Sequence, residues 1–195
     1  MSHRVTELHN IMPIVNIPSV LEHGILSHQR CSKLPHADVS MADVQDTRDH
    51  KQVPGGLKLH EYANLYFHAR NPMMSARSHQ AANLCVLRVS IDVLELEGVV
   101  ISDQNAASKY VRFHSPSALN ALNFDKIYAE DWTHLGNQIA YWQHKSMKCA
   151  EVLVPHCVAS RYIQGAYVVS QDAENLLIQQ GFPHPIEISS NMFLL

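Results

Sequence analysis

The sequence predicts an α+β domain with a mostly antiparallel sheet, and three observations lead to this fold class. Short apolar runs are interspersed with short helical patterns, without the regular strand–helix–strand rhythm of a parallel sheet. The 195 residues are 46% hydrophobic and 17% charged, which is the composition of a folded domain with a sizeable core. No internal repeat and no Gly/Ser/Pro linker divides the chain. Residues 1–195 are therefore expected to form a single domain.

The first elements are a short strand or loop over residues 8–15 and a helix that ends near His23. Pro18 suits the first turn of this helix, because its missing N–H would have no partner there in any case. Gly24 is a typical stop at the end of a helix. The polar stretch that follows predicts one short helix near residues 39–46.

The later elements follow from apolar runs and turn residues. The Pro54-Gly55-Gly56 triplet predicts a turn before the next strand. Strands are expected over residues 57–70, 83–91, 99–102, 148–154, 165–170 and 186–189. Helices are expected over residues 117–123, with Ser117 as the N-cap, and over 135–142 and 171–180.

The composition argues against several classes of protein. No apolar run approaches the roughly 18 residues that a membrane helix needs, and the first ten residues lack the apolar core of a secretory signal. The four cysteines are widely spaced and form no C-x-x-C pair. We therefore expect a cytoplasmic protein in a reducing compartment, with no membrane partner.

The charged residues are unevenly distributed, although the net charge is only −3. Residues 48–88 carry six basic and two acidic side chains, whereas residues 92–103 carry four acids and no base. A local basic surface suits an enzyme that holds a phosphate-bearing ligand. Two ordinary solvated faces are the alternative.

Histidine is abundant, with 14 residues, which raises the hypothesis of a histidine-rich metal protein. The spacings do not support it, since no H-E-x-x-H motif occurs and no histidine pair stands at ligand spacing beside a cysteine. We expect no metal site.

Glu151 is the first candidate for chemistry. It lies in the run CAEVLV (residues 149–154), which otherwise has the character of a buried strand. Burying an unpaired carboxylate is expensive, so the acid is either paired with a cation, or directed into a cleft, or at an edge facing water.

Two further segments could bind a ligand. The aromatic run LYF (residues 65–67) leads to Arg70, where rings could stack on a planar group and the guanidinium could hold a phosphate or carboxylate. Arg48, in a polar segment ahead of the 54–56 turn, could bind a pyrophosphate. A core strand followed by a turn, and a solvated helix end, are the simpler interpretations of these two segments.

Together and in this order, these segments resemble the DarT-type DNA ADP-ribosyltransferases, the toxins of DarT–DarG toxin–antitoxin systems. The resemblance covers residues 8–190 and rests on four motifs: IMPIVN (11–16), Arg48 ahead of Val53-Pro54, the run YFHARNPM (66–73), and AEVLV (150–154). The third motif is the most specific. The resemblance implies two small, mostly antiparallel sheets around an NAD⁺ cleft, with flanking helices.

The resemblance also assigns roles in the transfer reaction. Glu151 would be catalytic, supporting an oxocarbenium-like ribose and helping to remove a proton from the acceptor. Arg48 would contact the phosphate or ribose of NAD⁺ and orient the acceptor. Tyr66 would stack near the nicotinamide, and Arg70 would also bind the cofactor.

The first strand is expected to meet the nicotinamide amide through its backbone at Asn10 and Met12. A shift of one residue would put His9 in the place of Asn10. No metal is implied.

On the acceptor side, Trp132 and Trp142 could stack on a base of single-stranded DNA, unless both rings belong to the core. Tyr110 and Arg112 are further candidates for DNA contact. The thymidine-modifying branch of the family would carry a histidine where this chain has Tyr110, and Pro13 also replaces an expected histidine. These departures favour guanosine over thymidine as the acceptor.

The resemblance further implies a role as a toxin, with a cognate ADP-ribosyl hydrolase as antitoxin. Two alternatives stay open: an ADP-ribosyltransferase that acts on RNA or protein, and a non-catalytic NAD⁺-binding module.

Overall fold

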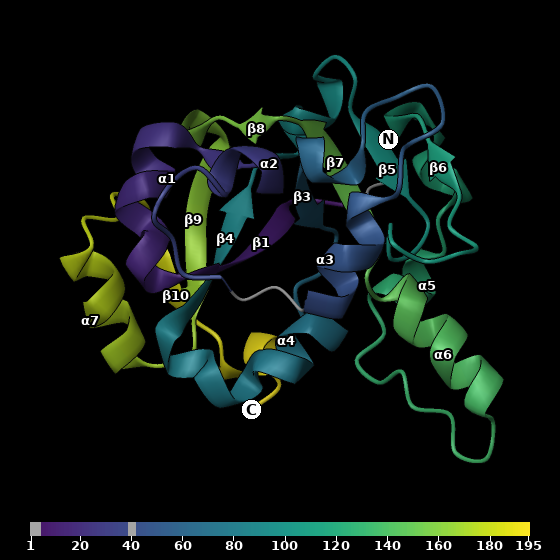
Figure 1. Cartoon of the computed structure of the whole chain (residues 1–195). Coiled ribbons are helices and arrows are strands. Elements are labelled where there is room, and N and C mark those ends of the chain that lie inside the picture. The colour runs from purple at the N-terminus through teal and green to yellow at the C-terminus, as the bar shows by residue number, and fades with distance from the viewer. Residues whose placement is uncertain (1–4, 39–41) are drawn as a thin grey trace.

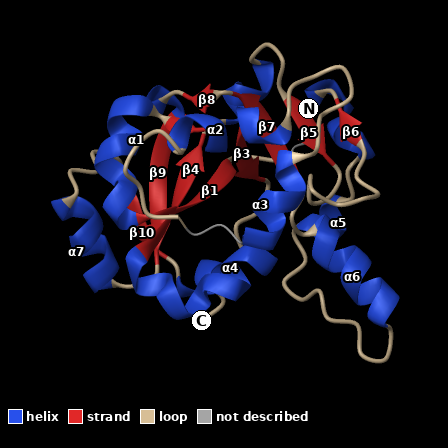
Figure 2. Ribbon diagram, in the orientation of Figure 1, coloured by secondary structure: helices blue, strands red, loops and turns tan. Residues whose placement is uncertain are grey.

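The computed structural model describes residues 5–38 and 42–195 and mixes helices with strands (Figures 1 and 2). The strands are β1 (Leu8–Pro13), β2 (Ile25–Leu26), β3 (Tyr62–Tyr66), β4 (Leu84–Val89), β5 (Val100–Ser102), β6 (Phe113–His114), β7 (Glu151–Pro155), β8 (Cys157–Val158), β9 (Ile163–Val168) and β10 (Ile186–Ile188). The helices are α1 (Ile17–His23), α2 (His28–Cys31), α3 (Ala42–Asp49), α4 (Pro72–Arg77), α5 (Phe124–Ile127), α6 (Gln138–Met147) and α7 (Gln171–Gln179).

Eight strands form one sheet in the order β10-β9-β4-β1-β3-β7-β5-β6, and β2 pairs with β8 in a separate small sheet. All the pairings are antiparallel except that of β10 with β9. The predicted α+β class with a mostly antiparallel sheet is confirmed.

The eight-stranded sheet consists of two half-sheets that meet at a single residue pair. Strand β1 pairs with β4 over its whole length, Leu8–Pro13, but it pairs with β3 only where His9 faces Tyr66. Beyond this pair, the side-chain amide of Asn10 donates to the carbonyl of Asn64 at 3.1 Å. The two small sheets that the sequence predicted are thus present as half-sheets joined at one rung.

Helices cover both faces of the sheet. The larger core lies on one face and includes Val20 of α1, Phe124 of α5 and Leu177 of α7. A smaller core on the other face includes Met74 of α4 and Phe193 near the C-terminus. Figure 1 shows α6 and the loop before it extending away from the sheet, beyond α5.

The helix α1 ends as the sequence predicts. Gly24 has φ = +80°, and a Cβ at this position would collide with the Val158 carbonyl of β8. Both facts require glycine. The expected helix near residues 39–46 corresponds to α3, which runs from Ala42 to Asp49, and residues 39–41 lie outside the described residues.

Two predicted strands are shorter than expected. The strand expected over 57–70 is limited to β3, because Leu59–Glu61 form a 3₁₀ turn that hydrogen-bonds back to the 51–58 segment. The strand expected over 148–154 begins only at Glu151, because the preceding residues complete the end of α6, with Ala150 N–H donating to Met147.

The predicted start residues of two helices were wrong. The helix expected over 117–123 is a 3₁₀ helix, Pro116–Ala121, with Ser115 rather than Ser117 as its cap. The helix expected over 135–142 is α6, which begins after the capping residue Asn137. In both cases a capping side chain close in sequence fixes the start.

The helix α4 was missed by sequence reasoning, which treated Asn71-Pro72 as a turn. The Asn71 side chain accepts hydrogen bonds from the backbone N–H groups of Met73 and Met74 at 2.9 and 3.2 Å, so it is an N-cap. No helix within residues 5–38 and 42–195 is long and apolar enough to cross a membrane.

Candidate active site

Three side chains from three adjacent strands form one row across the sheet. His9 of β1 faces Tyr66 of β3, and Tyr66 faces Glu151 of β7. Directly opposed residues of antiparallel strands project from the same face, so the three side chains lie together. Glu151 is only 1% exposed. The alternative of an edge carboxylate facing water is therefore excluded.

The Glu151 carboxylate is fully partnered. Arg48 Nη1 lies 3.1 Å from both carboxylate oxygens, and the Ala106 N–H donates to Oε1 at 2.9 Å. The Glu151 N–H donates to Ser102 Oγ at 3.0 Å, which fixes the start of β7. Arg48 is itself buried. The structure thus brings together the two residues that the sequence predicted to be catalytic, 103 positions apart, as a buried ion pair.

The helix α3 carries Arg48 and is held by His60. The two ring nitrogens of His60 lie 2.9 Å from Gln45 Oε1 and 3.3 Å from Asp49 Oδ1, one helical turn apart on α3. Burial and the neighbouring His28 lower the pKa of His60, against the opposing effect of Asp49. These contacts with two residues one helical turn apart hold α3 against the Leu59–Glu61 turn that precedes β3.

A cavity of about 540 Å³ opens beside the ion pair. Its walls come from α3, β3, α4, α6 and the loop at 105–108. The lining residues relevant to chemistry are Arg48, Asn64, Tyr66, Trp142, Lys145 and Cys149. A concave site of this size with aromatic walls and a few polar groups is typical of small-molecule binding.

Tyr66 stands between the ion pair and α4. Its hydroxyl contacts Met73 Sδ at 3.2 Å. Burial raises the pKa of Tyr66 well above its usual value, and the Glu151 carboxylate adds to this effect. The ring therefore stays a neutral phenol that can pack against a ligand.

The first strand does not present all its predicted residues to this face. The side chains of Asn10 and Met12 lie on the opposite face of β1, where Met12 packs against the larger core. His9 is the residue of β1 that shares the face of Glu151. The backbone contacts predicted for Asn10 and Met12 stay a prediction.

The structure places Arg70 away from the cavity lining. Its Nη1 donates to the Glu130 carbonyl at 2.7 Å, and its Nε donates to the carbonyl and side-chain oxygens of Asn191 at 3.2 Å. The guanidinium is thus engaged with two backbone segments, which the sequence could not indicate because both lie far along the chain.

The four residues predicted to contact DNA differ in their exposure and in their position relative to the cavity. Trp142 is 61% exposed and lines the cavity, so it does not belong to the core. Tyr110 is 78% exposed, and Arg112 is also exposed. Trp132 is partly buried, with its ring 5.5 Å from Lys148 Nζ. Only Trp142 among these four lines the cavity.

Lys145 was missed by sequence reasoning. It stands three positions after Trp142 on α6, and both line the cavity. Residues three apart share one face of a helix, so the aromatic–cation pair W-x-x-K could have been noticed.

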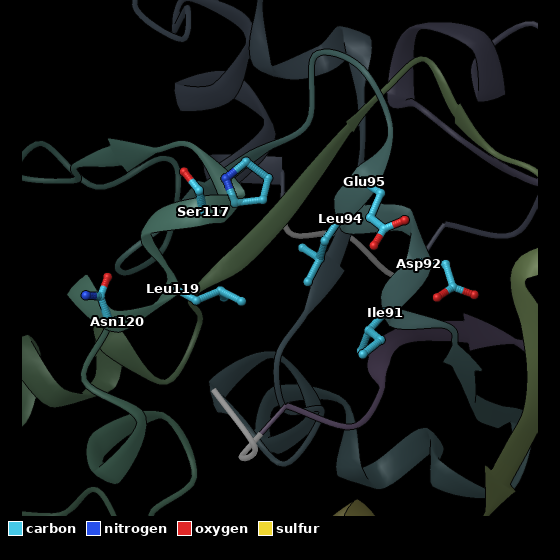
Figure 3. Close-up of a pocket in the computed structure, with 8 residues that line it drawn as sticks. Ile91, Asp92, Leu94, Glu95, Ser117, Leu119 and Asn120 are labelled. Carbon is cyan, nitrogen blue, oxygen red and sulfur yellow. The ribbon is translucent and has the colours of Figure 1, made fainter. Parts of the chain in front are cut away.

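A second hollow, of about 710 Å³, lies between the 3₁₀ helices Ile91–Glu95 and Pro116–Ala121. The carboxylates of Asp92 and Glu95 stand on one side of it, with Ser117 and Asn120 on the other (Figure 3). Carboxylates repel phosphate groups, so this hollow does not suit a phosphate-bearing ligand. The cavity at Arg48 is the better candidate, although it is smaller.

Within the part of the chain that the structure describes, no group of three or more His, Cys, Asp or Glu side chains could hold a metal ion. All four cysteines are free thiols.

Comparison with known proteins gives consistent results. The family model DarT, described as ssDNA thymidine ADP-ribosyltransferase, matches residues 9–194. A Thermosipho africanus protein described as a DNA ADP-ribosyl transferase–DNA ADP-ribosyl glycohydrolase fusion is 31% identical over 190 residues, which are 90% of this chain and 46% of that protein. This chain therefore spans about half the length of that relative. A Thermus sp. DNA ADP-ribosyl transferase is 26% identical over 196 residues, covering 91% of this chain and 89% of that protein.

Solved structures agree on the fold. Thermosipho africanus DarTG in complex with ADP-ribose has a TM-score of 0.82 at 28% identity, over 97% of this chain and 51% of that one. Thermus sp. 2.9 DarT in complex with ADP-ribosylated ssDNA also has a TM-score of 0.82, at 23% identity, over 96% of both chains.

Proposed function

Because the chain belongs to the DarT family, whose model matches residues 9–194, we propose that it transfers ADP-ribose from NAD⁺ to a base of single-stranded DNA. The observation that carries this proposal is the buried Arg48–Glu151 pair, which stands in the row with Tyr66 beside the cavity.

The transfer breaks the bond between the ribose C1′ and the nicotinamide nitrogen and forms a bond from C1′ to a nitrogen of the base. Nicotinamide leaves with the bonding electron pair, and the base loses a proton. The Glu151 carboxylate stabilises the positive charge that develops on the ribose and can hold a hydroxyl or accept the proton. Arg48 holds that carboxylate in place through Nη1.

The residues of the site fit NAD⁺. Arg48 and Lys145 offer two cations to the pyrophosphate, and Tyr66 and Trp142 offer rings to its planar groups. One buried polar atom on the face of this row, His9 Nδ1, has no hydrogen-bond partner in the described structure. Buried polar atoms are normally satisfied, so polar groups of a ligand would fit there.

On the acceptor side, Trp142 is an exposed ring that lines the cavity, and it can stack on an unpaired base. We take guanosine as the preferred base, because Tyr110 stands where the thymidine-modifying branch would carry a histidine. The family description names thymidine, so the acceptor base needs a direct test.

We further propose that residues 1–195 fold as one domain that acts as a toxin in the cytoplasm, opposed by an ADP-ribosyl hydrolase. The fusion of the two activities in the Thermosipho africanus relative supports this partnership. The shared core across α1, α5 and α7 supports the single domain, and the free thiols suit a reducing compartment.

Mass spectrometry of single-stranded oligonucleotides incubated with the protein and NAD⁺ tests the proposal. One oligonucleotide contains guanine but no thymine, and the other contains thymine but no guanine. We expect the mass of one ADP-ribose to be added to the first oligonucleotide, and no addition with Glu151→Gln. The exposed Glu97→Gln serves as the matched control and should behave like the parent.

Addition to the thymine oligonucleotide alone would contradict the guanosine preference but not the reaction. If RNA or protein were labelled and DNA were not, the proposed acceptor would have to be changed from DNA to RNA or protein. If the protein bound NAD⁺ but released no nicotinamide, the result would favour the alternative of a non-catalytic NAD⁺-binding module.

A further inference from the structure

Backbone carbonyls at the end of α5 accept hydrogen bonds from three basic side chains. We name residues 126–130 the α5 turn, and its four engaged carbonyls are those of Lys126, Ile127, Ala129 and Glu130. The donors are His144 at 3.0 Å, Lys148 at 2.8 Å to each of two carbonyls, and Arg70 at 2.7 Å. The last carbonyls of a helix have no partner within the helix, so these side chains replace water there.

Lys148 is the central donor and is fully buried. Among the described residues no carboxylate lies within salt-bridge distance of its ammonium. Its Nζ lies 3.4 Å from His68 Nδ1, and burial lowers the pKa of His68 to about 3, so that imidazole is neutral and can accept. Burial, with Arg70 nearby, lowers the pKa of Lys148 to about 8. A buried ammonium satisfied only by neutral acceptors is costly, which indicates a specific role.

The α5 turn leads directly into the acceptor side of the site. The chain continues from the turn to Trp132, whose ring lies 5.5 Å from Lys148 Nζ, and then to α6. Trp142 and Lys145 of α6 line the cavity. Lys148 itself stands three residues before Glu151, so one ammonium joins the catalytic strand to the root of the segment that carries both tryptophans.

We propose that Lys148, assisted by Arg70 and His144, is a positioning residue that holds the 128–147 segment against the catalytic strand and so sets the affinity for the nucleic-acid acceptor. This inference rests on the proposed function for the identity of the acceptor. Apart from His68, which follows β3, the groups that Lys148 contacts belong to the α5 turn and to Trp132. It touches neither Arg48 nor the Glu151 carboxylate in the hydrogen bonds described above.

Lys148→Met removes the donors and keeps the length of the side chain. We expect the KM for a single-stranded oligonucleotide to rise about tenfold or more, because a small displacement of the segment that positions the acceptor strongly weakens its productive binding. The KM for NAD⁺ and the rate of NAD⁺ hydrolysis without DNA should stay within about twofold of the parent. Lys33→Met, at an exposed lysine, is the matched control.

A spectroscopic readout separates positioning from a general loss of structure. The chain has two tryptophans, Trp132 and Trp142, and both lie in the 128–147 segment. In protein labelled with 5-fluorotryptophan, fluorine NMR should show a shifted and more solvent-accessible Trp132 resonance in Lys148→Met and no change in Lys33→Met. Trp132→Phe assigns the resonance.

His144→Ala is a second, milder variant, which removes the contact with the Lys126 carbonyl. It should produce the same pattern to a smaller extent, and it provides the test if Lys148→Met does not fold. An unchanged Trp132 resonance in both variants would overturn the inference. A parallel loss of NAD⁺ hydrolysis and DNA transfer would also overturn it, because the lysine would then act on the whole site. A parent protein that modifies no oligonucleotide would contradict the proposed function alone, and the Trp132 resonance would still decide whether Lys148 holds the segment.

Discussion

The buried Arg48–Glu151 pair allows a quantitative prediction about folding that is independent of catalysis. Glu151→Ala removes the carboxylate and leaves the guanidinium of Arg48 buried with neither of its 3.1 Å acceptors. It also leaves the Ala106 N–H without its 2.9 Å acceptor. Removing one partner of a buried ion pair costs about 3–5 kcal/mol. For a chain of this length, a change of about 1 kcal/mol shifts the Tm by roughly 2–4 °C. We therefore expect Glu151→Ala to lower the Tm by roughly 6–20 °C.

The double variant Arg48→Ala, Glu151→Ala tests the reason for this loss. If most of the cost comes from the uncompensated guanidinium, removing it as well should destabilise the protein little further. Chemical denaturation of the parent, both single variants and the double variant gives the coupling energy, which we expect to exceed about 1 kcal/mol. Arg48→Ala alone should also be destabilised, because it isolates the buried carboxylate.

Additive effects of the two single variants, within about 0.5 kcal/mol, would refute the reasoning. Glu151→Gln is the matched variant for activity, because it keeps the volume and one acceptor oxygen. It should lose the transfer reaction while keeping more of the stability than Glu151→Ala.

Three further predictions concern the acceptor side and pH. Trp142→Ala should weaken oligonucleotide binding by roughly 1–3 kcal/mol, or about 5- to 150-fold by fluorescence anisotropy, with little change in Tm because the ring is exposed. Burial alone would raise the pKa of Glu7, but hydrogen bonds from His9, Arg88 and Tyr167 outweigh it and lower the pKa to about 2. At pH values above the unfolded pKa of Glu7, near 4.5, the ionised carboxylate therefore stabilises the fold. This contribution, of order 1–2 kcal/mol after solvent screening, is lost as the pH falls towards 2. In an acid titration of stability, Glu7→Gln should not show this loss. Burial lowers the pKa of Lys148 from 10.5 to about 8, so the unfolded state binds more protons between these values. The unfolding free energy of the parent relative to Lys148→Met should therefore rise from pH 8 towards 10.5, and a constant difference would contradict the assignment.

A cation partner for Glu151 could be anticipated from the sequence because a lone acid in an apolar run is unusual. Glu151 required a partner, and the structure supplies Arg48. Local patterns left the choice between pairing and exposure open, since the two residues come together through tertiary contacts such as those of His60 with α3. The faces on which His9 and Asn10 lie likewise depend on strand register, which a short strand with no alternation of polarity does not define.

The roles of Lys148 and Arg70 could not be predicted for a different reason. Their acceptors are backbone carbonyls, which every residue has, so no sequence pattern marks them. Lys148 follows directly after α6, where a basic residue normally faces solvent and favours the helix dipole. Burial of its ammonium is a property of the tertiary structure alone.

The single rung between the half-sheets has a mechanical consequence for the site. When two plates share one line of contact, a change in the angle between them displaces each point in proportion to its distance from that line. His9 and Tyr66 are the two residues on the line, and Glu151 is the next one along the same row. The helix α6 extends away from the sheet (Figure 1) and would move most. A change in the angle would therefore leave the spacing of His9, Tyr66 and Glu151 nearly constant while the cavity changes in width.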